Sequence, residues 1–226
     1  MNGYIQNALE PLNNPKQFLK DSTIDSFSHA MIKSTAGAED TIIWISSLAV
    51  ATFITRVKNT KTFEDQETKD FCNAALGLNK GRDDLPDNMQ DATKTKAGLP
   101  MKKHLLLSLN YQNHWSLLFI KQCPSIPKQF VYHYDSRGTN LKFSKELIHY
   151  LTLSGVLKSP FKSKNAHVPS QTGAYHCGYH VCGYVAYIVH TNQEIKKNHL
   201  NIFKCIKPKK FAIFIKKRIE FYQKIQ

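Results

Sequence analysis

The first half of the chain combines a helical pattern of apolar positions with a long polar stretch. Within residues 15–34 apolar side chains recur at helical spacing, which predicts a helix that Asp21 or Ser22 caps. Residues 39–56 form a second apolar run, which predicts a helix or, alternatively, a strand. Residues 57–103 are polar and predict an inserted, variable region. The apolar positions of the first helix are Ile24, Phe27, Ala30 and Met31.

From residue 104 onwards the pattern changes to short β-type runs. Residues 104–110 and 114–120 are largely apolar, and the short link between them indicates a β-hairpin. A third run of this type covers residues 129–135. We expect a helix over residues 142–157 and a short edge strand over residues 165–170.

Two further helices are expected near the end of the chain. The run that starts at Cys177 is apolar around most of a helical circumference, which indicates a buried helix. Residues 211–225 have the pattern of an amphipathic helix. Helices, then a sheet, then helices predict an α+β fold, and a chain of 226 residues is expected to form a single domain over residues 1–226.

The composition is that of a globular protein. With 42% apolar residues the chain can bury a substantial core, and no run reaches the roughly 18 apolar residues that a membrane-spanning helix needs. The N-terminus lacks the basic start and apolar centre of a signal peptide, and an odd number of cysteines argues against a disulfide framework. We therefore expect a soluble monomer in a reducing compartment, the cytoplasm or the nucleus.

The chain is strongly basic, with a formal net charge of +14. Residues 195–226 carry ten Lys or Arg residues and a single acid, Glu220. Such a segment is either a solvated basic face or a contact for an anionic surface such as nucleic acid, phosphoinositide or an acidic protein. Charge alone does not decide between these two interpretations.

The stretch QTGAYHCGYHVCGYVAYIV, residues 171–189, concentrates residues that can carry chemistry. Cys177 stands at the expected start of the buried helix, where free N–H groups and the helix dipole favour a thiolate. The small Gly178 beside it would leave this thiolate accessible. An inert, buried cysteine is the alternative. A zinc site is disfavoured, because its candidate ligands do not share one helix face. Those ligands are His176, Cys177, His180 and Cys182.

A nucleophilic thiol needs a base, and two expected strands offer one. His114 starts one strand and Asp135 ends the next, so pairing of the strands would let the carboxylate orient the imidazole. Gln171 precedes Cys177 by six residues and could donate its amide to an oxyanion, with the Cys177 N–H as the second donor. These four residues would make a cysteine acyl-transfer site.

Three motifs, in this order, resemble the Ulp/SENP-type cysteine proteases of the adenovirus-protease-like clan, which remove ubiquitin-like modifiers. They are His-Trp-Ser at 114–116, Tyr-Asp-Ser at 134–136, and Gln171 followed by Cys177-Gly178. The resemblance is clear over residues 104–190. The stretches LLLSLNYQNHWSLLFI (105–120) and VYHYDS (131–136) are most similar to the small deneddylase branch. The resemblance implies a papain-like α+β fold, with a central mixed sheet flanked by helices. It also implies the catalytic order His114, Asp135, Cys177 and no cofactor.

The same resemblance suggests substrate contacts. The segment from Phe18 to Asp21 resembles the family's Trp-Leu-Asn-Asp substrate-binding segment, with Phe18 in place of the tryptophan. Trp115 matches a second tryptophan, and the two aromatic rings would wall a channel for a Gly-Gly tail. The family usually has an aspartate before the nucleophile, where this chain has His176. Residues 57–103 have no counterpart in the family pattern.

We therefore expect a thiol isopeptidase that acts on lysine conjugates of ubiquitin or a ubiquitin-like protein, with NEDD8 and SUMO as the other modifiers. A preference for ubiquitin follows if the chain is an effector that a microbe exports into a host cell. The alternative is an effector-type acetyltransferase of the same clan, which would use the triad with acetyl-CoA and an inositol-phosphate activator. Trp115 favours the protease, because it would cover the Gly-Gly channel.

Overall fold

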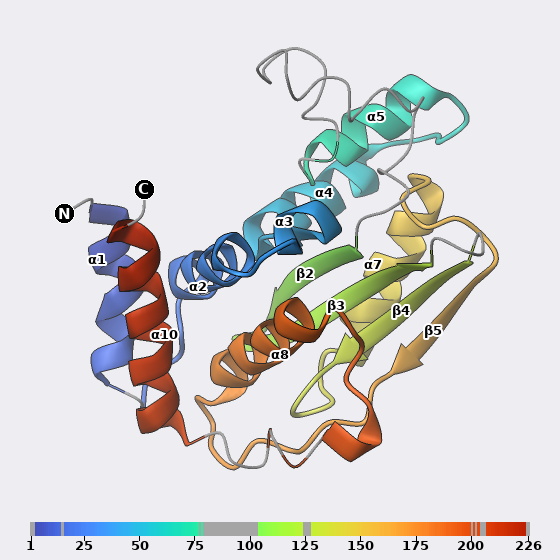
Figure 1. Ribbon diagram of the computed structural model, residues 1–226. Coiled ribbons are helices and arrows are strands. Elements are labelled where there is room, and N and C mark those ends of the chain that lie inside the picture. Colours follow the sequence, from blue (N-terminus) through green and yellow to red (C-terminus); the bar gives the residue numbers. More distant parts are fainter. Residues whose placement is uncertain are drawn as a thin grey trace.

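The computed structural model describes residues 3–14, 16–76, 78, 104–123, 128–199, 201, 203 and 207–224. Within these residues the strands form one five-stranded sheet in the order β1-β2-β3-β4-β5 (Figure 1). Strands β2, β3 and β4 are antiparallel neighbours, whereas β1 and β5 run parallel to β2 and β4 at the two edges. The strands are β1 (Ile42–Ile45), β2 (His104–Tyr111), β3 (His114–Cys123), β4 (Lys128–Tyr134) and β5 (Phe161–Asn165).

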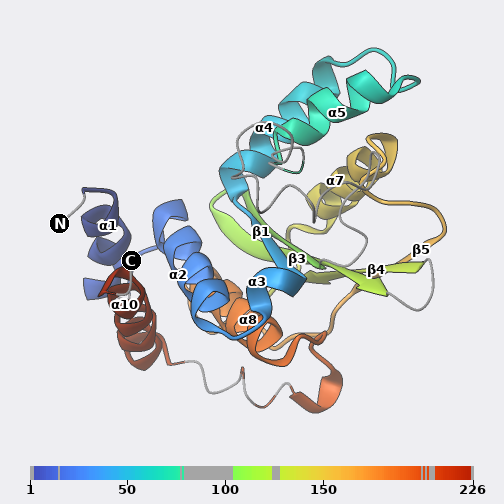
Figure 2. The ribbon, with the colours of Figure 1, turned by 45° about the horizontal axis from the view of Figure 1, so that its top comes forward.

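Helices cover both faces of this mixed sheet. Figure 2 shows the sheet between α8 on one side and α4, α5 and α7 on the other. Alternate residues of β3 divide between the two cores, with Leu117 and Phe119 in the first and Leu118 in the second. The α-helices are α1 (Gly3–Leu9), α2 (Asp21–Ser34), α3 (Ala38–Thr41), α4 (Ser47–Asn59), α5 (Gln66–Ala74), α7 (Leu141–Leu153), α8 (Cys177–Thr191) and α10 (Pro208–Lys224), and the short 3₁₀ helices are η1 (Glu10–Asn13) and η2 (Lys197–His199).

The apolar run at 39–56 contains both a strand and a helix. Its first part, β1, pairs in parallel with β2, and α4 begins almost directly after it. Ser46 separates the two elements, because its side chain accepts a hydrogen bond from the backbone N–H of Ala49 and so caps α4. The prediction of a single element was therefore wrong, since sheet pairing captures one part of the run and a cap starts the other.

Three boundaries differ from the sequence predictions. The edge strand is β5 and not residues 165–170; four of its five residues are exposed, so no apolar alternation marks it in the sequence. Helix α2 has Lys20 at its N-cap without a side-chain hydrogen bond, so neither Asp21 nor Ser22 caps it. Helix α7 stops at Leu153, before the predicted end. Gly155 follows with φ of 76°, a backbone conformation that continues no helix.

The predicted insertion is described only in part. Helix α4 extends to Asn59 and α5 follows it, while residues 79–103 lie outside the described residues. Among the helices that the structure describes, none is long and apolar enough to cross a membrane. The division into a single domain stays a prediction.

The β2–β3 hairpin positions the first candidate catalytic residue. Gln112 and Asn113 form its two-residue turn, with φ of 50° and 58°, the left-handed conformation that tight hairpins require. Tyr111 consequently pairs with His114, which becomes the first residue of β3. In the pairing of β3 with β4, Leu117 lies opposite Tyr134. Asp135, the residue after Tyr134, therefore lies near the start of β3.

Candidate active site

The ends of β3 and β4 bring a histidine and an aspartate into contact. His114 Nε2–H donates a hydrogen bond to Asp135 Oδ1 at 2.6 Å, and both side chains are almost fully buried. Two backbone groups in the turn after β4 also donate to the carboxylate. They are the N–H of Arg137, at 2.9 Å from Oδ1, and the N–H of Asn140, at 2.8 Å from Oδ2. The carboxylate is thereby fixed toward the imidazole.

These contacts set the charge of Asp135. Burial alone would raise the pKa of this carboxyl, but the hydrogen bond from His114 and the two backbone N–H groups hold it well below its usual range. Asp135 is therefore ionised at every physiological pH. An ionised partner at hydrogen-bond distance stabilises the protonated form of the imidazole.

Cys177 is the first residue of α8 and lies beside the same imidazole. His114 Nδ1 is buried and has no hydrogen-bond partner among the described residues, while the Cys177 thiol interacts with the ring. Burial alone would lower the pKa of His114, but Asp135 and the thiol raise it to about 9. The structure thus brings together Cys177, His114 and Asp135 from one helix and two strand ends.

The Cys177 side chain is fully buried, with an exposed fraction of 0%. This corrects the expectation that Gly178 would leave the thiolate accessible. Gly178 instead lets the chain segment before α2 approach closely, since a Cβ at this position would lie 2.9 Å from Cβ of Leu19. Cys177 shares a buried cluster with Leu19 and Trp115.

Asn140, which the sequence pattern did not single out, links the two strands that carry the candidate catalytic pair. Its Nδ2 donates to the carbonyl oxygen of His114 and to Oγ of Ser116, each at 3.0 Å, while its backbone N–H contacts Asp135. Asparagine at the start of a helix usually caps it, but the Asn140 side chain makes no cap to α7. It points instead to β3, so that one buried residue positions both His114 and Asp135.

We expect Asn140→Ala to reduce turnover by about 10-fold to 100-fold, because small displacements of catalytic groups have effects of this size. The initial rate with a modifier-based fluorogenic substrate, measured well below the melting temperature, tests this. Asn73→Ala is the matched control, since Asn73 Nδ2 also donates to a backbone carbonyl, that of Ser154, in another part of the fold. A purely structural role for Asn140 would lower the melting temperature of both variants and leave turnover of the folded protein unchanged.

Gln171 lies in the loop before α8 and is hydrogen-bonded to Ser136, the residue after Asp135. Ser136 Oγ–H donates to Gln171 Oε1 at 2.7 Å, and the backbone N–H of Gln171 donates to the Ser136 carbonyl at 3.1 Å. Gln171 Nε2 donates to the carbonyl of Gly173 at 2.7 Å. An oxyanion would have to compete with this carbonyl for the amide. The oxyanion role of Gln171 stays a prediction.

His176, in the position of the family's aspartate, packs against the same loop. A Cβ at Gly173 would lie 2.7 Å from Cε1 of the His176 ring, and His176 Nδ1 is 3.4 Å from Oγ1 of Thr172. Burial lowers the pKa of His176, so the ring is neutral at physiological pH. His176 therefore packs against the loop and adds no charge beside Cys177.

A groove of about 750 Å³ is lined by Asn113 and Trp115, the residues on either side of His114 in the sequence, and by Phe18. Phe18 is 37% exposed and makes an edge contact with Tyr175, with ring centroids 4.8 Å apart. Trp115 is only 3% exposed, and its Nε1–H donates to the Leu19 carbonyl at 3.1 Å. Trp115 is therefore both a core residue and a groove wall, whereas Phe18 is free to contact a ligand.

The groove also contains two carboxylates, from Asp21 and Asp25, one turn apart on α2. Burial raises the pKa of Asp25 to about 6, and the hydrogen bond that Trp44 Nε1–H donates at 2.9 Å lowers it in part, while Asp21 raises it further. A bound cation would relieve the repulsion between the two acids. Asp21 was predicted as a substrate contact. Asp25 was not predicted, although its spacing of four residues from Asp21 placed both acids on one helix face.

The groove walls predict a separation of stability from reactivity. We expect Phe18→Ala to slow covalent capture of a probe with a Gly-Gly tail while leaving the melting temperature nearly unchanged, because this ring is partly exposed. Discrimination against a tail that ends in alanine should weaken at the same time. Phe71→Ala, an exposed phenylalanine on α5, is the control. Equal capture rates for the two variants would remove Phe18 from the channel. For Trp115→Ala, which removes a buried ring, we expect the free energy of unfolding to fall by about 3–5 kcal/mol.

The described residues contain no cluster of three or more His, Cys, Asp or Glu side chains arranged to bind a metal ion. Cys182, a ligand of the disfavoured zinc site, is fully buried, and burial raises the pKa of its thiol far above the usual value. Asp25 adds to this shift. The Cys182 thiol is thus held in the neutral form.

Comparison with known proteins gives one family match and several structural matches. The sequence profile of the Ulp1 protease family, C-terminal catalytic domain, matches residues 46–218, which is more than half of the chain. No curated protein sequence shows significant similarity. The crystal structure of a de-sumoylating protease matches with a TM-score of 0.59 at 17% identity, over 96% of this chain and 85% of the other.

Two further structures carry bound modifiers. The C-terminal Ulp1 protease domain in complex with Smt3, the yeast ortholog of SUMO, matches with a TM-score of 0.59 at 17% identity, over 93% of this chain and 80% of the other. The Xanthomonas campestris effector protein XopD, bound to ubiquitin, matches with a TM-score of 0.54 at 17% identity, over 91% of each chain. At these identities the similarity shows the fold.

A mixed sheet flanked by helices, with a cysteine at a helix start beside a histidine and an aspartate, defines the papain-like class of cysteine proteases. The family profile then gives the branch of that class. The chain belongs to the Ulp1 protease family, and the protein is a cysteine protease of that family.

Proposed function

We propose that this protease is a thiol isopeptidase that removes ubiquitin or a ubiquitin-like modifier from lysine side chains. The observation that carries the proposal is the position of Cys177 beside His114, which is hydrogen-bonded to Asp135, near a groove with aromatic walls. A narrow Gly-Gly tail suits such a groove, because flat rings exclude any tail residue that carries a Cβ. The family assignment supports this function and gives the acetyltransferase alternative no support.

The proposed reaction begins with transfer of the Cys177 thiol proton to His114 Nδ1. The thiolate attacks the carbonyl carbon of the modifier's last glycine, and the backbone N–H of Cys177 and the Gln171 amide stabilise the oxyanion. His114, held by Asp135, then gives its proton to the lysine nitrogen as the carbon–nitrogen bond breaks. Water, deprotonated by His114, hydrolyses the resulting thioester and releases the modifier's carboxylate.

The groove also supports a preference among modifiers. Asp21 and Asp25 supply negative charge, and the groove's lysine, Lys20, is already paired with Glu10 at 2.6 Å. A tail with an arginine before the two glycines would complement this charge. Ubiquitin and NEDD8 have such a tail, whereas SUMO does not. This charge favours ubiquitin and NEDD8 over SUMO, and we propose ubiquitin as the first of the two on the hypothesis that the protein is an effector acting in a host cell.

Covalent reaction of the protein with a panel of propargylamide probes, built on ubiquitin, NEDD8 and SUMO, tests both the isopeptidase function and the modifier preference. We expect the ubiquitin probe to react fastest, and a ubiquitin probe with glutamine in place of the final arginine to react more slowly. Asp21→Asn combined with Asp25→Asn should reduce the difference between these two ubiquitin probes. Fastest capture of SUMO would refute the modifier preference, and capture of no probe by the folded protein would refute the isopeptidase function.

The location of the enzyme follows from the same proposal. Conjugates of these modifiers are found in the cytoplasm and nucleus, and we propose that the protein acts there, as a resident enzyme or as an exported effector. XopD, one of the similar structures, is itself an effector protein.

A further inference from the structure

Helix α10 packs on the core through one narrow face. Its buried residues are Ala212, Ile215 and Ile219, which join the same hydrophobic cluster as Phe27 of α2. Arg218 also faces the protein, because its Nη1 donates to Ser34 Oγ at 3.2 Å. These contacts fix the rotation of the helix about its axis. Figures 1 and 2 show α10 beside α1 at one end of the molecule, and the residues on its opposite face are exposed.

That opposite face combines regular positive charge with exposed apolar side chains. Lys210, Lys217 and Lys224 recur at intervals of seven residues, which places them almost in line along the helix. Between them lie Ile213 and Phe221, which are 56% and 51% exposed. A helix face that exposes both lysines and large apolar side chains can bind an anionic surface through charge and through burial of apolar area. These five residues are called the α10 outer face below.

We propose that the α10 outer face docks on a membrane surface that contains anionic lipids. The lysines would pair with lipid phosphate and carboxylate groups, and Ile213 and Phe221 would enter the boundary between headgroups and acyl chains. The acid of this helix, Glu220, lies 4.0 Å from Lys216, so it is offset by a lysine outside the face. The docking concerns the exposed face of α10 and is independent of which modifier is cleaved.

The composition of the face favours a membrane over nucleic acid. Nucleic-acid surfaces use arginine forks on phosphates and aromatic rings that stack on bases. The arginine of α10 is committed to Ser34, and Ile213 has no π face for stacking. An exposed isoleucine beside an exposed phenylalanine is instead suited to insertion between lipids, where both lose contact with water.

Co-sedimentation of the full chain with phosphatidylcholine vesicles, with and without phosphatidylserine, tests the proposal. We expect binding only to the vesicles with phosphatidylserine, weakened by added salt. Replacing Lys210, Lys217 and Lys224 with glutamine should weaken binding by about 100-fold, because each lysine near an anionic surface contributes about fivefold. Ile213→Ser with Phe221→Ser, which leaves the charge unchanged, should also weaken binding.

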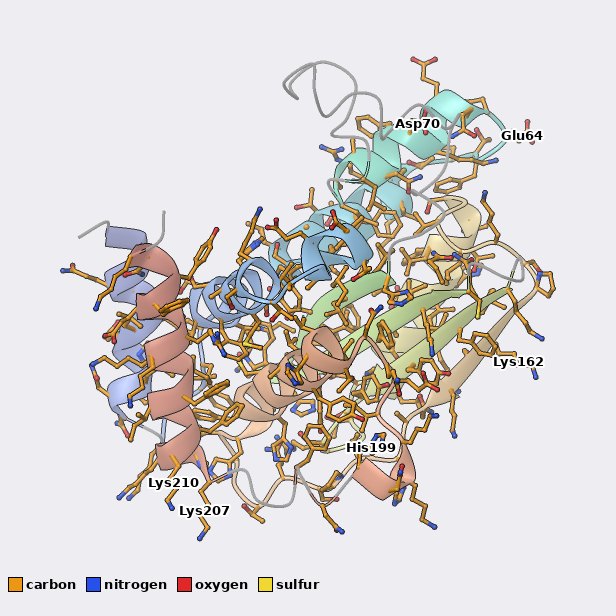
Figure 3. All side chains as sticks on the ribbon, viewed as in Figure 1. Glu64, Asp70, Lys162, His199, Lys207 and Lys210 are labelled. Atoms are coloured by element: carbon orange, nitrogen blue, oxygen red, sulfur yellow. The ribbon has the colours of Figure 1, made fainter. Side chains whose placement is uncertain are left out.

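The matched control removes the same charge elsewhere, through Lys145→Gln, Lys162→Gln and Lys164→Gln. These lysines are exposed on α7 and β5, and Figure 3 shows Lys162 on the side of the molecule opposite Lys210. The control should bind vesicles like the unchanged protein, and all variants should react equally with a soluble ubiquitin probe. An equal loss of vesicle binding in the control variant would overturn the proposal. Vesicle binding that is unchanged by Ile213→Ser with Phe221→Ser would also overturn it. Binding of duplex or single-stranded oligonucleotides in place of vesicles would overturn it in favour of nucleic acid.

Discussion

Cys177→Ala should abolish conjugate cleavage and probe capture, whereas Cys182→Ala should retain most of the activity. Cys177 contacts the His114 ring at the start of α8, while Cys182 is fully buried with its thiol held neutral. Intact-mass analysis after incubation with the ubiquitin probe measures the adduct, and peptide mapping locates it. The two substitutions remove the same atom from the same helix, so Cys182→Ala is a close control.

Two outcomes would contradict this assignment. An adduct on Cys182 in the unchanged protein would mean that Cys182, five residues further along α8, is the nucleophile. Undiminished cleavage by Cys177→Ala would exclude thiol catalysis at this position. Because both cysteines are buried, the melting temperature of each variant is needed to separate lost chemistry from lost folding.

The second large effect concerns the base. His114→Ala should lower kcat/KM by at least about 1,000-fold, because the thiolate loses its proton acceptor and the leaving amine loses its proton donor. His149→Ala, on an exposed position of α7, is the control and should be fully active. A His114→Ala enzyme with ordinary turnover at neutral pH would exclude the proposed catalytic pair.

Asp135→Asn should be milder and should change the pH dependence in a defined direction. The protonated imidazole is stabilised by Asp135 and the thiol, which raise the pKa of His114 to about 9, so activity of the unchanged enzyme should fall as the pH rises through that value. Without the carboxylate the imidazolium is less stable and its pKa falls. The alkaline limb of kcat/KM should therefore move to lower pH in Asp135→Asn.

Asp65→Asn provides the control for this pH profile. Asp65 is exposed and caps α5, away from the catalytic pair, so its loss should leave the alkaline limb in place. An unchanged limb in Asp135→Asn would mean that the carboxylate does not set the charge of His114.

The sequence by itself determined the elements with strong periodicity. The three central strands, the helix that starts at Cys177 and the amphipathic final helix all follow from local apolar patterns, which need no knowledge of distant residues. The resemblance of the His-Trp-Ser and Tyr-Asp-Ser motifs also indicated the family, because chemistry restricts the residues at these positions. The contact between His114 and Asp135 then follows from the pairing of two short strands.

Only the tertiary structure decided the features that depend on residues far apart in the chain. Asn140 looks like a helix cap in the sequence, yet its side-chain amide donates a hydrogen bond to the His114 carbonyl in β3. Gln171 accepts a hydrogen bond from Ser136, and Leu19 packs against the start of α8 at Gly178. The edge strand β5 carries no apolar alternation, because its backbone pairs with β4 while most of its residues face solvent. Local patterns report which side chains are buried, but the choice of partner for a polar side chain is made only when the whole chain has folded around it.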